Sequence, residues 1–292
     1  FSVSVGTHPD TINLNMKWDN NDQGMTKGNV NANGFISVNK QGNPTLKIFI
    51  LPTSAYVNGE QWKINPATIT IDSSSTHVDN IYINNGNKFF SLDGFSTLNP
   101  DDKMKFVFDG VNLAYLNKLS SNDANSGGME LNLGGTVKGY INISDLKKAP
   151  RLESDIKVDG FTFNNSPYGN INIRSEWDNN EKEINIDVAN NFEGAKYFDI
   201  TGTYKPSAET IDLKADLSGM PLNIINPLVK SFASDLRGFG NGKLNLRGRL
   251  NHLYLVGGLR ARDASLRVDF LQIRYYLNDS IRFTTKGIEF KN

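Results

Sequence analysis

The sequence contains no cysteine, which removes disulfide bonds, thiolate metal ligands and cysteine nucleophiles together. Its three histidines, His8, His77 and His252, lie far apart and form no pair with the spacing of metal ligands. No apolar run approaches the ~20 residues that a membrane-spanning helix needs, and no signal peptide is visible. These absences argue against a zinc enzyme and against a histidine-based catalytic triad. We therefore predict no metal site and no cofactor.

The sequence also lacks a net charge, with 31 basic and 31 acidic residues among 292. This balance hides an asymmetry, because eight of the ten arginines lie between Arg237 and Arg282. Such a cluster is typical of proteins that contact phosphate groups. The arginines alternate with apolar residues, however, which favours the solvent face of β-strands. We expect no nucleic acid partner and a contact with an anionic surface, either lipid head groups or an acidic protein. The residues predicted for this contact are Arg247, Arg249, Arg260, Arg262 and Arg267.

Apolar and polar residues alternate along most of the chain. The clearest segments are Ile12–Trp18, Ile184–Val188 and Ile211–Leu217. Successive side chains of a strand point to opposite faces, so each segment has one apolar and one polar face. Clusters of Asn, Asp and Gly separate these segments, as expected for hairpin turns. The pattern predicts an all-β fold, an antiparallel sheet with one dry and one wet face.

Two stretches break the alternation, and they suggest an internal repeat. Apolar residues three and four apart predict short helices near 112–119 and 222–232, each between a strand and a Gly-rich linker. Gly110 and Gly219, which precede the two stretches, are separated by 109 positions. We predict repeats at about 86–160 and 195–292, with 1–85 a less regular strand-rich segment. Stacked repeats favour an elongated, curled sheet.

The motifs that carry chemistry are incomplete. The segment Asp19–Gly24 begins like a calcium loop, but its twelfth position is Val30 and its flanks are strand-like. The glycines of Gly238–Gly242 precede a strand, whereas a phosphate loop follows a strand and opens a helix. No G-x-S-x-G motif is present. The carboxylates lie mainly on the polar side of alternating strands. We predict no catalytic residues and no enzyme activity.

The apolar face admits more than one architecture. In a β-sandwich two such faces close on each other, whereas an incompletely closed sheet leaves an apolar trough for acyl chains. The repeat favours the trough, a taco-like open groove. A β-sandwich in the cell envelope or at the cell surface, binding a glycan or protein, is the alternative. The predicted lining of the groove consists of Ile184, Ile186, Val188, Ile211, Leu213, Leu217, Leu244, Leu246, Leu266 and Val268.

The C-terminal half resembles the repeat of the TamB C-terminal region. In that family a strand-ending glycine precedes "PL" and a short helix, and a "G-x-L-x-L-x-G-x-L" strand follows. Leu217–Leu228 and Gly242–Leu250 are similar to these two parts, and Leu253–Ala264 is similar to the next strand pair except that its usual proline is replaced. The tail Val268–Phe290 is similar to TamB homologues of the Bacteroides group. The resemblance is weaker over 90–160 and is limited to the alternation over residues 1–85.

The resemblance implies a single fragment, residues 1–292, of a longer envelope protein that an N-terminal segment absent here anchors in the inner membrane. Proteins of the TamB and AsmA type are bridge-like lipid carriers whose curled sheet encloses an apolar groove. They are linked to phospholipid movement toward the outer membrane and to outer-membrane protein assembly with a barrel partner, TamA or BamA. The resemblance therefore implies a periplasmic location, acyl chains as ligands, and no catalytic residue.

Overall fold

The computed structural model describes residues 2–8, 10–20, 26–39, 42–117, 132–226 and 233–290. The strand pairs of this part are antiparallel and belong to one sheet, so the predicted all-β antiparallel fold is confirmed. Its helical segments include three short 3-10 turns, η1 (Leu113–Leu116), η3 (Pro206–Ala208) and η4 (Leu222–Ile225), and the residues directly after η1 and η4, Asn117 and Asn226, are α-helical. Two of these turns lie where short helices were predicted. The remainders of those predicted helices, 118–119 and 227–232, lie outside the described residues.

The chain forms two compact units. Unit 1 consists of Phe1–Val111 and Val137–Ser154, and unit 2 consists of Asn112–Thr136 and Asp155–Asn292.

The strands before the first 3-10 turn are β1 (Ser2–His8), β2 (Thr11–Asn20), β3 (Thr26–Val38), β4 (Pro44–Ile50), β5 (Thr53–Val57), β6 (Glu60–Ile64), β7 (Ala67–Asp72), β8 (Thr76–Asn85), β9 (Lys88–Ser96) and β10 (Lys103–Asn112). The strands after it are β11 (Leu133–Ser144), β12 (Arg151–Phe163), β13 (Ser166–Asp178), β14 (Glu183–Asn191), β15 (Phe198–Lys205), β16 (Thr210–Pro221), β17 (Ala233–Arg249), β18 (His252–Val268), β19 (Ile273–Leu277), β20 (Ser280–Thr284) and β21 (Gly287–Phe290).

In unit 1 a long hairpin is interrupted at the same level on both arms. The first arm consists of β4 and β5, the second of β6 and β7, and the turn Asn58–Gly59 joins them. Pro52 separates β4 from β5, and Pro66 separates β6 from β7. Proline has no N–H to give to the ladder, so the two prolines break the arms opposite each other. As a result β3 pairs with β4 over part of its length and with β5 beyond it.

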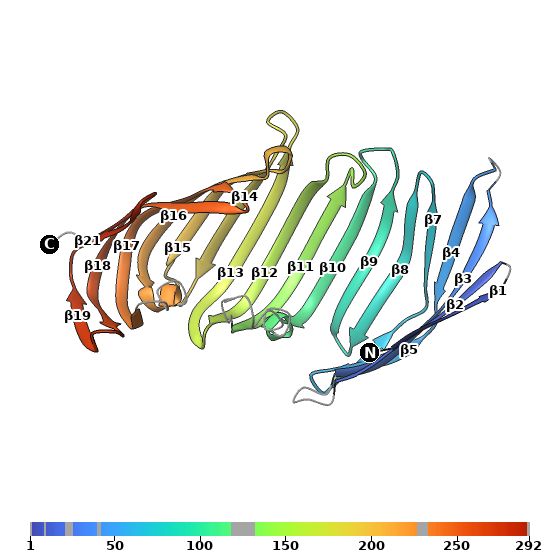
Figure 1. Cartoon of the computed structure of the whole chain (residues 1–292), viewed down its shortest axis with the longest axis horizontal. Helices are drawn as coiled ribbons and strands as arrows, with labels where there is room; N and C mark the ends of the chain where they lie inside the picture. The colour runs from blue at the N-terminus through green and yellow to red at the C-terminus, as the bar shows by residue number, and fades with distance from the viewer. Residues whose placement is uncertain are drawn as a thin grey trace. The chain divides into compact units, whose positions relative to one another are not determined.

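In unit 2 the strands from β13 to β18 pair in chain order, each with the next, and lie side by side in Figure 1. β18 then pairs with β19 near its end and with β20 further back, and β21 pairs with β20. Tight turns permit this order. Asn164 and Asn165, between β12 and β13, both have positive φ, as a type I′ hairpin turn requires. The abundance of asparagine in the sequence thus has a direct structural use.

Asparagine and aspartate also hold β-bulges. In each of three bulges a residue with positive φ donates its backbone N–H to a side-chain oxygen on the neighbouring strand or, for Asp263, in the turn that follows it. Each bulge inserts one residue, so the apolar side chains before and after it are three positions apart instead of two. The three pairs of bulge residue and acceptor are Asn80 with Asp93, Gly219 with Asn241, and Asp263 with Asn278.

The two stretches that suggested a repeat share a hydrogen-bonding device. The side chain of Asn117, just after η1, accepts from the backbone N of Leu133 (2.8 Å) and donates to the carbonyl of the same residue (2.9 Å). Asn226, just after η4, accepts from the N of Leu236 (2.8 Å) and donates to its carbonyl (3.5 Å). Asn117 and Asn226 are 109 positions apart. In both places an asparagine side chain pairs with the returning strand as a peptide group would.

Candidate functional site

The main candidate site is the apolar face of unit 2. Residues directly opposite each other in an antiparallel ladder share one face of the sheet. The register therefore extends the apolar side of each strand into rows that cross the sheet. One row passes through Leu213, the next through Leu244, and a third through Leu217. These rows are Ser175–Ile186–Gly202–Leu213–Leu246–Leu255, Ile173–Val188–Ile200–Ala215–Leu244–Gly257–Phe283, and Phe198–Leu217–Gly242–Leu259–Ile281.

All ten residues predicted to line a groove lie on this face. Eight of them lie in the three rows above or in the adjacent row Ile184–Tyr204–Ile211–Gly248. Leu266, like Leu217 and Leu244, packs against the buried cluster that contains Leu259, and Val268 follows it on the same side of β18. Ile184 is buried, whereas the other nine are only partly buried. Partial burial in the middle of strands shows that these side chains pack on their neighbours while one side of them faces solvent.

One end of the apolar face is covered. Leu222, from η4, is 3% exposed and packs on the sheet at Gly240, where a Cβ would lie 2.8 Å from its Cδ2 atom. Apart from hydrogen-bonded neighbouring strands, η4 against β17 is the main contact between described elements. The buried cluster under this cover consists of Leu222, Leu236, Leu259, Ala261, Ala264 and Ile281, with Leu217, Leu244, Leu266 and Phe283 packed against it.

A buried tyrosine fixes the position of η4, the turn that covers this end of the apolar face and that we call the cover. Tyr168 of β13 is fully buried, and its hydroxyl donates to Oδ1 of Asn223 on η4 over 2.8 Å. Burial raises the pKa of Tyr168, so the hydroxyl stays protonated and keeps this bond at physiological pH. Asn190, also buried, donates to the carbonyl of Tyr168 and accepts from the backbone N of Phe198. These bonds connect η4 to β13, β14 and β15.

Glycines on the apolar face bring neighbouring backbones close. A Cβ on Gly202 would lie 2.0 Å from the carbonyl oxygen of Asp212, and one on Gly242 would lie 2.1 Å from that of Gly258. Both glycines have positive φ. Glycine kinks of this kind are a means by which sheets are curved. The two glycines therefore leave gaps in the rows where neighbouring backbones approach closely.

Unit 1 carries an apolar face of its own, which the predicted lining did not include. The alternation in Leu46–Ile50 and Ala67–Ile71 is the sequence signal for it. As in unit 2, its members range from buried, such as Val78, to partly exposed, such as Ile71. The longest row of this face is Ile12–Gly34–Ile48–Ile69–Val78–Gly94–Met104.

The five arginines predicted to contact an anionic surface lie on the opposite, polar face of unit 2. Arg247 is paired across the strands with Asp212, with 3.0 Å between Nε and Oδ1. Arg262 lies over the ring of Phe239 and 3.8 Å from Asp263. Within the described part of the chain, Arg249 and Arg260 have no ion pair. The polar face is thus a mixture of paired and unpaired charges.

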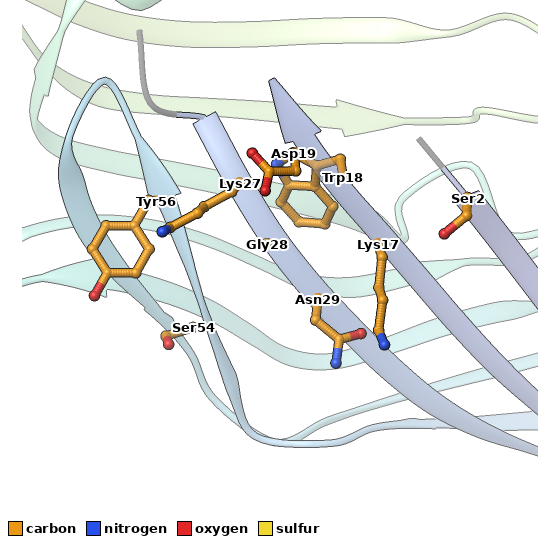
Figure 2. Close-up of a pocket in the computed structure, with 9 residues that line it drawn as sticks. All are labelled: Ser2, Lys17, Trp18, Asp19, Lys27, Gly28, Asn29, Ser54 and Tyr56. Carbon is orange, nitrogen blue, oxygen red and sulfur yellow. The ribbon is translucent and has the colours of Figure 1, made fainter. Parts of the chain in front are cut away.

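A shallow depression of about 520 Å³ lies in unit 1. Figure 2 shows its nine lining residues, which come from β1, β2, β3 and β5. Lys27 Nζ lies 5.3 Å from the ring centre of Tyr56, and Asp19 stands opposite Lys27 in the ladder. The lining includes Ser2 and Ser54 but no histidine, so it does not assemble a serine nucleophile with a histidine base. The geometry identifies no reaction for this depression.

No family model, curated protein or solved structure matches the chain. In the described residues there is no helix long and apolar enough to span a membrane. The same residues contain no group of three or more histidine, aspartate or glutamate side chains placed to hold a metal ion. The apolar face of unit 2 is therefore the feature that bears most directly on function.

Proposed function

We propose that this chain is part of a TamB-like bridge protein of the periplasm that carries phospholipid acyl chains along an apolar sheet face. The observation that supports this most is the set of continuous apolar rows in unit 2, whose members are mostly only partly buried. Leaving such a face in water is costly, because each CH₂ that is buried contributes about 0.8 kcal/mol. An acyl chain laid along the rows removes this cost.

The chemistry of the face favours the chains of a lipid over its head group. Across the strands, the row through Leu213 contains only aliphatic residues, glycine and Ser175. Such a lining selects ligands by length and fit, since it offers no recurrent charge to a phosphate or amine. We propose a carrier and not an enzyme, with no cofactor and no nucleic acid partner. Attachment to the inner membrane belongs to parts of the protein outside these residues.

A role in outer-membrane protein assembly is a second candidate, and one observation favours it. Every residue of β1 is exposed, and among the described strands β1 pairs with β2 alone. An exposed strand edge can add a strand from another chain. In this role a barrel protein of the TamA or BamA type is the proposed partner.

Uptake of a fluorescent phospholipid by delipidated protein tests the carrier function. Leu246→Asp places a charge on the apolar face, and Asn245→Asp places the same charge at the neighbouring position on the polar face. We expect the wild type and Asn245→Asp to take up lipid and Leu246→Asp to lose most of the uptake. Equal uptake by both variants would show that this row does not hold the chains, and no uptake by the wild type would refute the proposal.

A further inference from the structure

The turn between β18 and β19 contrasts with the polar turn between β13 and β14 of the same unit. Phe270 is 86% exposed at this turn, and Leu271 beside it is also exposed. By contrast, the turn between β13 and β14 consists of polar residues, where Asp178 accepts from the backbone N of Asn180. Phenylalanine and leucine are unusual in a turn that faces only water.

Apolar side chains surround this turn on both faces of the hairpin. Ile273 stands opposite Val268 and so continues the apolar face, whereas Tyr276 stands opposite Ser265 on the other face and is 79% exposed. A strand that only extended the sheet would be apolar on one side. We call Phe270, Leu271, Ile273, Tyr275 and Tyr276 the β18–β19 tip; all five are exposed.

Arginines stand at the base of the tip. Arg267 and Arg274 are directly opposite each other in the ladder. Asp235 accepts hydrogen bonds from Arg237 and from Arg274, and these bonds lower the pKa of its carboxyl group. The turn itself contributes Asp269, so three arginines (Arg237, Arg267 and Arg274) stand against two carboxylates, which leaves one net positive charge beside the apolar tip.

We propose that the β18–β19 tip inserts into the interface of an anionic phospholipid bilayer. Aromatic and aliphatic side chains that enter the interface, together with adjacent arginines, are the two components of interfacial binding. A protein partner fits less well, because a standard interface buries about 800 Å² on each side and this feature is the end of a single hairpin. The proposal concerns the bilayer surface and does not depend on lipid carriage along the apolar face.

The absence of native cysteine makes a direct test practical. Phe270→Cys labelled with an environment-sensitive fluorophore reports on the tip, and Asn180→Cys labelled in the same way reports on the polar turn of β13–β14. With vesicles of phosphatidylglycerol and phosphatidylethanolamine, we expect a blue shift and a severalfold gain in emission at position 270 and no change at position 180. An unchanged spectrum at position 270 would overturn the proposal.

A second experiment uses unlabelled protein, with the apolar face left intact. Phe270→Ser combined with Leu271→Ser removes the two turn residues, and their exposure makes a loss of the fold unexpected. We expect vesicle binding to fall by about tenfold or more. Unaltered binding would contradict insertion. A spectral change at position 270 that needs no vesicles and grows with protein concentration would assign the tip to an interface between copies and would also overturn the proposal.

Discussion

The apolar face of unit 2 has a covered region and an open region built from the same kinds of residue. Leu259, under η4, is 3% exposed, whereas Leu213, two strands away, is only partly buried. Both are leucines in the middle of strands with glycine opposite them on one side. The comparison shows that a four-residue turn converts part of an open sheet face into a core. The covered region can stabilise the sheet while the open region remains available to a ligand.

The largest expected effect comes from truncating a leucine in the covered region. Leu259→Ala leaves a cavity among Leu222, Leu236 and Ile281, so it should lower the free energy of unfolding by about 2–5 kcal/mol. Leu213→Ala removes the same atoms where solvent can fill the space, and should cost about 1 kcal/mol. Urea denaturation of the two variants measures the difference. Equal losses would mean that the face around Leu213 is as enclosed as the core.

Introducing a charge in the open region should have an intermediate effect on stability and a large one on lipid retention. In Leu213→Asp the carboxylate can stay hydrated, so the loss of stability should be about 1.5–3 kcal/mol, close to the lost apolar burial. The protein should fold, melt earlier and retain little lipid. Asn245→Asp is the control with the same charge change on the polar face. If Leu213→Asp is unfolded after purification, the open region is closed at this residue.

A smaller loss is expected when the asparagine beside the cover is removed. Asn226→Ala deletes both side-chain bonds to the backbone of Leu236 and should cost about 1–2 kcal/mol. Because Asn117 makes the same bonds to Leu133, Asn117→Ala should cost a similar amount. Thermal unfolding of both variants tests whether this asparagine has the same role in the two predicted repeats. A marked loss in one variant alone would show that only one asparagine has this role.

The smallest effect is a pH dependence that arises at Asp235, which precedes Leu236 of the covered region. Hydrogen bonds from Arg237 and Arg274 hold the pKa of Asp235 below its usual value. The stability that this carboxylate contributes is therefore fully present above the ordinary aspartate pKa of about 3.9 and is lost as the pH falls through the lowered value. Hydrogen exchange near Leu236 should accelerate in that range relative to Asp235→Asn, whose exchange should lack this step. Identical pH profiles would exclude this contribution.

The contrast between regions also explains what the sequence could predict. Alternation alone predicted the all-β fold and the common face of Ile186, Leu213 and Leu246, because a period of two is a property of each strand by itself. The cover was only partly predictable. Spacing indicated a short helix beginning near Leu222, but its packing on Gly240 depends on how distant strands come together.

Bulges limited the prediction in another way. The bulge at Gly219 moves the apolar side from Leu217 to Met220, and the one at Asp263 moves it from Ala261 to Ala264. A binary pattern cannot distinguish such a shift from the end of a strand. The exposed Phe270 was missed for a related reason, because a phenylalanine in an apolar segment is expected to be buried. Only its position at a turn reveals that it is exposed.

The central claim is that the open region of the apolar face holds acyl chains. Mass spectrometry of the lipids extracted from the purified protein tests it most directly, with Leu213→Asp and Asn245→Asp purified in parallel. We predict phospholipid in near-stoichiometric amounts, with varied head groups, from the wild type and Asn245→Asp, and little from Leu213→Asp. Wild-type protein that is well folded and carries no lipid, or equal lipid in all three preparations, would contradict the claim.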